Sequence, residues 1–578
     1  MTTASNANLA VLDNAASLGR FWTLRRVLVV LSGLLVLVIC WQVDGVRLAT
    51  MVQPATLRAL WTFLRGLFPP DLSPGFLRTV FHALVSTVAT AIAGTILSAL
   101  IAIPLGALAT PVLWRRGILL ARDNGNWLAP LQSSASRTVL ALLGFLRAVP
   151  DLVWGLLFVT AVGLGSLAGA LALAVGYAGV LGRVYADVFA HVELEPLEAL
   201  QATGATRAQI FLLGIWPQAR PSVTAYTLYS FECCVRAASV LGFVGAGGIG
   251  YEISLSMRLF EYRQVMTLIL AFVLLLALTD VVSRRLRARL QPNAGSIRRQ
   301  PRFHKERVVW RTLGYVLVIV AAVVSFYLAG FSPEHFGEAN ILKNMLRFCR
   351  GMVPPDLAKE FLFSLGPLLM QTLAISILGT AIGVLIGGIL AVPAASVLVL
   401  GQPGSPGAGS QAQRAFRWSA FWVARLLLNL LRSIPDLVWV LICILVIGIG
   451  PFAGTLAIGL HTAGVLGKLY AETLEEVPMA PVEALRALGA RPLQLLAWAF
   501  WPQAKPMLAS YTVLRWEANL RVSAILGLVG GGGLGQAIYN NVQLGFYSRL
   551  ATLLLLVYLL VMVSDWLGDR VSRRTVGV

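Results

Sequence analysis

Charged residues are scarce in this sequence. They make up 12% of its 578 residues, and the mean hydropathy is +0.78, so an ordinary soluble protein is excluded. The apolar runs lack the alternation of barrel strands. The first run, from Val27, has no small-residue cleavage site of a secretory leader. These absences predict an all-α polytopic membrane protein.

Motifs for metal, disulfide or nucleotide chemistry are also missing. The only Gly-Lys pair, Gly467-Lys468, is followed by Leu469 and lacks the upstream glycine of a phosphate-binding loop. The cysteines and histidines have no framework or ligand spacing, and we expect packing or structural roles for them: Cys40, Cys233, Cys234 and Cys443 in apolar spans, Cys349 in a loop, and His82, His191, His304, His335 and His461. No cofactor, metal site or covalent chemistry is therefore predicted in this chain.

Acidic residues are outnumbered by basic ones, 26 to 46. The basic residues gather before the first apolar run, after the second, in the stretch from Arg284 and in the tail. If the N-terminus is cytoplasmic, twelve spans place all of these segments in the cytoplasm. Membrane topology, with both termini cytoplasmic, then explains the charge, and nucleic-acid binding is not expected. Attraction to anionic lipid headgroups is compatible with this topology.

Apolar runs long enough to span a membrane recur along the chain. We predict about twelve spans, near 24–43, 79–110, 138–163, 165–189, 219–244, 264–283, 309–329, 364–394, 420–449, 452–473, 506–529 and 548–567. They divide the chain into a first half, 1–290 (core about 70–290), a basic cytoplasmic linker, 291–308, and a second half, 309–578 (core about 355–575). The flexible loop after the second span of the second half is expected in the cytoplasm.

The two halves repeat one pattern at a constant offset of 285 residues. The stretch from Glu198 reads EALQATGATRAQIFLLGIWPQARP, and the stretch from Glu483 reads EALRALGARPLQLLAWAFWPQAKP. Polar, glycine and proline positions persist while apolar residues change. The repeat predicts two equivalent half-sites about a shared axis.

The EAL segment predicts a helical hairpin. A short helix is expected from about Glu198, broken near Gly204, with a second helix running to about Trp216 and ended by Pro217. Such a hairpin can dock into a groove of a soluble partner. An interfacial loop that only connects two spans is the alternative.

The hairpin motif and its context resemble a known family. E-A-L-x-x-x-G with a proline thirteen residues after the glycine resembles the coupling helix of type I ABC importer permeases. Further stretches, among them RAVPDLVW and RSIPDLVW, WPQARP and WPQAKP, and LGFVGAGGIG and LGLVGGGGLG, are similar to phosphonate importer permeases, here with two copies fused.

The resemblance implies a non-enzymatic permease in the bacterial inner membrane that imports phosphonate or a related anion (phosphite, hypophosphite or phosphate). It implies an ATPase homodimer that binds Mg-ATP and an extracytoplasmic binding protein as partners. The ATPase would seat the coupling residues Glu198, Ala199, Gly204, Pro217, Glu483, Ala484, Gly489 and Pro502. Import of another solute, such as an amino acid, remains an alternative; a secondary transporter would leave the coupling motifs unexplained.

Charges inside spans are costly and indicate function. The candidate translocation path consists of Arg147, Asp151, Glu232, Arg236, Arg432, Asp436, Glu517 and Arg521. Each acid and base four residues apart could neutralise the other within one helix. Alternatively, the arginines line the path, because a guanidinium matches a tetrahedral oxyanion in two hydrogen bonds. In that case, alanine at positions 236 and 521 should abolish uptake without affecting ATPase docking.

Proline and glycine mark two further features. Pro150 and Pro435 remove a helix donor inside a span, which indicates either a transport route or a packing kink. The glycine-rich stretches are expected to face outward, as a gate or as a plain re-entrant turn. The candidate gate residues are Gly245, Gly247, Gly248, Gly250, Gly530, Gly532, Gly533 and Gly535.

The copies also disagree at polar positions. Ser230 stands where the second half has Arg515, and Cys234 stands where it has Asn519. One wall of the path is therefore predicted to be less basic than the other.

Overall fold

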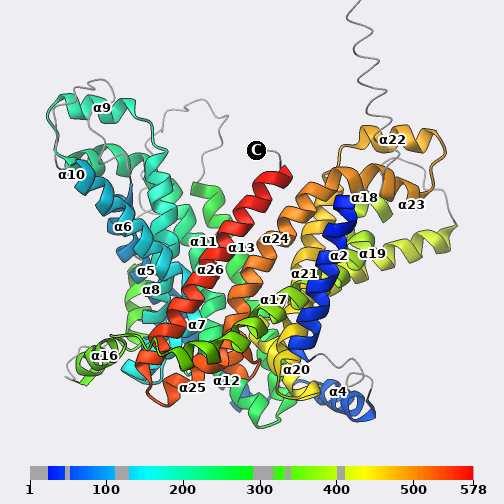
Figure 1. Ribbon diagram of the computed structural model, residues 1–578, viewed down its shortest axis with the longest axis horizontal. Coiled ribbons are helices and arrows are strands. Elements are labelled where there is room, and N and C mark those ends of the chain that lie inside the picture. The colour runs from blue at the N-terminus through cyan, green and yellow to red at the C-terminus, as the bar shows by residue number, and fades with distance from the viewer. Residues whose placement is uncertain are drawn as a thin grey trace, which may run out of the picture.

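The computed structural model describes residues 24–45, 53–110, 129–290, 316, 319–331, 340–399 and 410–576 (Figure 1). Within these ranges the secondary structure is helical and contains no strand. The predicted linker 291–308 and residues 401–409 of the predicted cytoplasmic loop lie outside the described residues.

The helices follow the same order in both halves. The first half has α2 (Leu24–Asp44), α4 (Pro54–Gly66), α5 (Pro74–Ala109), α6 (Ala129–Ala148), α7 (Asp151–Val162), α8 (Ser166–Ala190), α9 (Glu195–Ala202), α10 (Arg207–Gln209), α11 (Trp216–Gly242), α12 (Gly248–Arg258) and α13 (Tyr262–Leu290). The second has α16 (Asn340–Gly351), α17 (Lys359–Ala394), α18 (Ser396–Val399), α19 (Gln411–Ser433), α20 (Asp436–Ile447), α21 (Pro451–Glu475), α22 (Met479–Ala487), α23 (Pro492–Leu495), α24 (Trp501–Leu526), α25 (Gly533–Gln543) and α26 (Tyr547–Val576).

Long apolar helices confirm the polytopic all-α fold. Among the described residues, six helices are long and apolar enough to cross a membrane, and three bent helix pairs raise the number to nine. The other three predicted spans fall on the shorter apolar helices Leu31–Asp44 and Ile319–Leu328 and on α11. Charged residues lower the hydropathy of α11.

Two predicted spans, 138–163 and 420–449, are not single straight helices. Each is a pair, α6 with α7 and α19 with α20, bent by 86° and 95°. The bends occur at Pro150 and Pro435, which take extended backbone angles and serve as the N-caps of α7 and α20. A proline has no N–H to continue the preceding helix, and it disfavours helical geometry in the residue before it.

The carbonyls released at the bends are satisfied by protein groups. The indole of Trp154 donates to the carbonyl of Leu146 at 3.3 Å, and that of Trp439 donates to Leu431 at 3.0 Å. Each tryptophan lies about one turn beyond its proline. The PDLVW motif shared by the two copies therefore contains the proline that breaks the helix. It also contains the tryptophan N–H that satisfies the carbonyl left unpaired inside the membrane.

The first helix of each half packs against the opposite half. In Figure 1, α2 lies beside α17 and α21, and its Cys40 is buried against Ala374, Leu378 and Phe452. Conversely, Ala329 packs against Ala93 and Ala170 of the first half. The largest core cluster also contains residues from both halves, so the two copies form one body.

Helices α4 and α16 were not expected, because their segments are moderately polar. Cys349, expected in a loop, lies in α16. Helix α4 packs on α20, and α16 packs on α7, so both cross between halves. After α16, the carboxylate of Asp356 forms an ion pair with Arg549 at 3.1 Å. The hydrogen bond from the Ala358 N–H is the main cause that holds the pKa of Asp356 below its usual value, and the hydrogen bond from Arg549 is the second.

Candidate translocation site and coupling helices

The predicted coupling segments form two protruding hairpins. Helices α9 and α10 of the first half, and α22 and α23 of the second, lie at the end of the molecule where the C-terminus emerges (Figure 1). Gly204 and Gly489 both have φ of +81°, with open space around them. The predicted break is therefore confirmed at both glycines, in a left-handed conformation that a residue without a Cβ adopts easily.

The predicted ends of these hairpins need correction. The first helix begins at Glu195 rather than Glu198, and Pro217 does not end the second helix. Instead, a π-helical turn, Ile210–Ile215, runs directly into α11, where Pro217 occupies the first turn. Pro502 follows the equivalent turn, Leu496–Phe500. The wider π-turn accommodates the proline ring and its missing donor.

Inside each hairpin, one side chain packs on the π-turn, with complementary sizes in the two copies. In the first half Leu197 lies against Gly214, and in the second half Val482 and Ala499 belong to one apolar cluster. A Cβ on Gly214 would overlap the Leu197 side chain. The larger Leu197 is therefore paired with the smaller Gly214, and the smaller Val482 is paired with the larger Ala499.

Alanine at Gly214 should loosen the first hairpin by about 1 kcal/mol, the lower end of the cost of overpacking. Gly214→Ala is expected to weaken ATPase binding in a detergent pull-down, and Leu197→Val/Gly214→Ala should restore it by reproducing the second half's pair. A double variant no better than the single one would contradict this packing account.

The glycine-rich stretches form matching turns at the opposite end of the molecule (Figure 1). Gly245, Gly247 and Gly248 have φ of +101°, +75° and +72°, and Gly530, Gly532 and Gly533 have +104°, +75° and +70°. Threonines anchor the turns: Ile249 N–H donates to Thr87 Oγ1, and Leu534 N–H donates to Thr372 Oγ1, both at 2.9 Å. The re-entrant reading is thus supported, while the gating role remains a prediction.

Of the four expected intrahelical ion pairs, the described residues form one, Glu517 with Arg521 at 2.7 Å. Arg147 instead pairs with Asp565 of the other half at 2.8 Å, and Asp565 also lies 3.9 Å from Arg521. The pairing of Arg147 with Asp151 fails because the bend places them on different helices. In the same way, Arg432 is exposed and bonds Asn429 at 3.1 Å.

Glu232 and Arg236 do share a helix, but they do not pair. Arg287 of α13 forms an ion pair with Glu232 at 2.7 Å. The residue equivalent to Arg287 in the second half is Ser572. Arg236 is exposed and makes no ion pair among the described residues. Arg287, which has no counterpart in the second half, therefore pairs with Glu232 and leaves the Arg236 guanidinium without an ion pair among the described residues.

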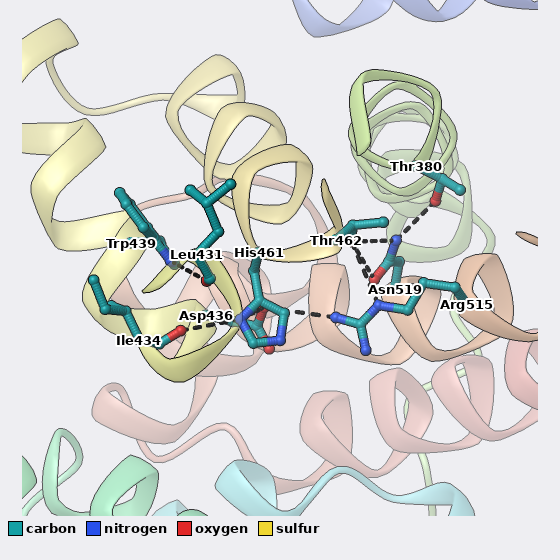
Figure 2. A network of polar contacts seen from close by, with 9 residues as sticks. All are labelled: Thr380, Leu431, Ile434, Asp436, Trp439, His461, Thr462, Arg515 and Asn519. Carbon is teal, nitrogen blue, oxygen red and sulfur yellow. Dashed lines mark hydrogen bonds and ion pairs between the residues drawn. The ribbon is translucent and has the colours of Figure 1, made fainter. Parts of the chain in front are cut away.

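A buried polar cluster lies behind the second bend (Figure 2). Asp436, the first residue of α20, is 3.5 Å from His461 of α21 and 4.0 Å from Arg515 of α24. His461 also bonds the carbonyl of Ile434, at 3.0 Å. Arg515 Nη2 is buried without a hydrogen-bond partner among the described residues. An unsatisfied buried donor of this kind favours an anion.

The same cluster continues through neutral polar groups. Asn519, 1% exposed, donates to Thr380 at 2.8 Å and to Thr462 at 3.0 Å. Arg515 Nε reaches Thr462 Oγ1 at 3.5 Å. These contacts join α17, α21 and α24 and fix the orientation of the guanidinium.

The first half has no such cluster. The positions of His461, Thr462, Arg515 and Asn519 are occupied by Gly176, Tyr177, Ser230 and Cys234. The expected asymmetry is therefore present, with its polar side in the second half. His461 was overlooked because no ligand spacing surrounds it; comparison of the two copies, where it replaces Gly176, contains the signal.

Electrostatic interactions connect the two halves at these bends. Arg236 of the first half lies within electrostatic range of His461 of the second, and Arg521 lies within the same range of Asp151. Asp151, Arg236 and Arg521 thus each lie near a titratable group of the opposite half.

The repeat matches a known family model twice. The model for the binding-protein-dependent transport system inner membrane component covers residues 117–295 and 404–577. The chain belongs to this family. It is accordingly an integral inner-membrane transport component.

Relatives of this binding-protein-dependent permease include both fused and single-copy proteins. It is 29% identical over 541 residues to the phosphate-import permease protein PhnE of Mycolicibacterium smegmatis, covering 92% of each chain. It is 35% identical over 258 residues to the phosphite transport system permease protein PtxC of Stutzerimonas stutzeri, covering 44% of this chain and 86% of that one. One half of this chain thus corresponds to a whole PtxC-like permease.

Proposed function

We propose that this chain is the complete membrane-spanning part of an ATP-driven importer for a phosphorus oxyanion such as phosphonate, phosphite or phosphate. The Arg515 guanidinium is the observation that carries the substrate class: its buried Nη2 lies 4.0 Å from Asp436 and makes no hydrogen bond among the described residues. Its fork suits a tetrahedral oxyanion, and the relatives named for phosphate and phosphite support the same class.

The two hairpins are the proposed seats of one ATPase homodimer, which would bind and hydrolyse Mg-ATP. Their placement at the C-terminal end of the molecule, opposite the glycine-rich turns (Figure 1), supports a cytoplasmic C-terminus. An extracytoplasmic binding protein would deliver the anion to the other end. Because one chain supplies both hairpins and both turns, a single copy suffices for the complex.

The anion would pass between the bends of the two halves. Arg236, which makes no ion pair among the described residues, offers a cation on one side. On the other side Arg515 offers its guanidinium, which Thr462 and Asn519 hold in place. Arg521, already neutralised by Glu517, contributes less. Such partly neutralised sites hold an anion loosely enough for it to leave, as conduction requires.

Proteoliposomes containing the chain, its ATPase and its binding protein test this function. ATP-dependent uptake of labelled phosphate or phosphite is expected, with no uptake when the ATPase cannot hydrolyse ATP. Uptake that persists without hydrolysis would indicate a secondary transporter. Active uptake of methionine with none of any phosphorus oxyanion would overturn the substrate class.

A further inference from the structure

A cavity of about 560 Å³ lies between the two glycine-rich turns and the helices that follow them, α12 and α25. These helices lie at the end of the molecule opposite the coupling hairpins (Figure 1). The volume falls within the range of about 300–1,000 Å³ typical of small-ligand sites.

The cavity is lined by equivalent faces of the two helices. On α12 the lining residues are Tyr251, Ser254, Leu255 and Arg258, and on α25 they are Gln536, Tyr539, Asn540 and Gln543. Their spacing of three and four residues places each set on one side of its helix. Every position of one set is 285 residues from a position of the other, so the cavity lies between equivalent elements of the two halves.

The two faces differ in charge. Arg258, the last residue of α12, is the only charged residue that lines the cavity among the described residues, and it is exposed. Its counterpart Gln543 is neutral, and α25 contributes amide and hydroxyl donors instead. The remaining lining includes Phe243, Leu441 and Leu528, which are apolar. The single cation sits on the first half, whereas the deeper Arg515 sits on the second.

The position suits an anion on its way to the deeper arginines. Helix α11 carries Arg236 and ends at Gly242, beside the cavity. From Arg236 to Phe243 is seven residues, about 10 Å along a helix. One cation among neutral donors can attract an oxyanion without holding it tightly.

We infer that this cavity is an outer binding site for the oxyanion, with Arg258 as its cation. The inference rests on the proposed function for the identity of the anion. Because equivalent faces of α12 and α25 line the cavity, a positive charge on either helix should serve the site equally well. Gln543→Arg should therefore restore the charge that Arg258→Gln removes.

Phosphate uptake by the reconstituted complex, measured against the concentration of loaded binding protein, tests the inference. Arg258→Gln should lower uptake about tenfold at subsaturating concentration, as expected for a lost charged hydrogen bond, while Arg258→Lys should retain most of it. Arg258→Gln/Gln543→Arg should recover uptake. Arg78→Gln, at an exposed arginine outside the cavity, is the matched control.

The outcomes separate the two proposals. Normal uptake by Arg258→Gln, or failure of the double variant to recover, would overturn the outer site while leaving the importer function intact. Absence of phosphorus-oxyanion uptake by the unaltered complex would remove the proposed function itself. Co-purification of Arg258→Gln with the ATPase in detergent is the expected sign that the complex still assembles.

Discussion

Replacing Arg515 with glutamine should reduce phosphorus-oxyanion uptake by about 10- to 100-fold, since hydrogen bonds to charged groups contribute about 1.5–3 kcal/mol. Arg515 supplies the buried guanidinium of the second half, and its Nη2 has no hydrogen-bond partner among the described residues. Glutamine keeps a donor but loses the charge and the fork. Initial rates of labelled phosphite uptake into proteoliposomes measure the effect.

Lysine at the same position separates charge from geometry. Arg515→Lys keeps the positive charge opposite Asp436 but cannot bind two oxygens in one plane, so intermediate uptake is expected. Arg414→Gln, at an exposed arginine of α19 in the same half, should leave uptake unchanged. Equal uptake by the Arg515→Gln variant and the unaltered chain would exclude Arg515 from the path.

Alanine at Gly250 should severely disturb the start of α12, next to the glycine-rich turn of the first half. A Cβ there would overlap the backbone carbonyl oxygen of Ser239, and a backbone atom cannot move aside as a flexible side chain can. Helix α12 would have to separate from α11, at a cost of about 1–3 kcal/mol or more. A lower melting temperature in detergent and loss of uptake are the expected results.

Two further alanine variants make this test specific. Gly535→Ala should have the same effect in the second half, because its Cβ would overlap the carbonyl oxygen of Ala524. Gly388 lies inside α17 with open space around it, so Gly388→Ala should be neutral or stabilising by about 0.5–1 kcal/mol. A normal melting temperature for Gly250→Ala would refute the close approach of α11 and α12.

Local features of this protein could be predicted from its residues. The breaks at Pro150 and Pro435 follow from a missing N–H, and the left-handed turns at Gly204 and Gly489 follow from a missing Cβ. Even here the continuation of the helix through Pro217 was missed. The reason is that a π-turn depends on the packing of the hairpin beneath it as well as on the proline.

The partners of the charged residues could not be predicted in the same way. Sequence spacing pairs Arg147 with Asp151 and Glu232 with Arg236, because residues four apart face each other on a straight helix. The 86° bend places Arg147 and Asp151 on different helices. Glu232 forms its ion pair with Arg287 instead of Arg236. The three-dimensional packing of α13 against α11 therefore decided that Arg236 makes no ion pair among the described residues.

The sequence by itself determined the fused repeat, the family, the all-helical membrane fold, the breaking prolines and the positions at which the copies differ. These properties depend on composition, period and local backbone chemistry. Only the tertiary structure decided that the first helix of each half packs on the other, that Arg147 meets Asp565, and that Asp436 contacts both His461 and Arg515. Each of these contacts joins residues distant in the chain. Packing of the two halves brings the first two sets together, and packing of α20, α21 and α24 within the second half brings the third together.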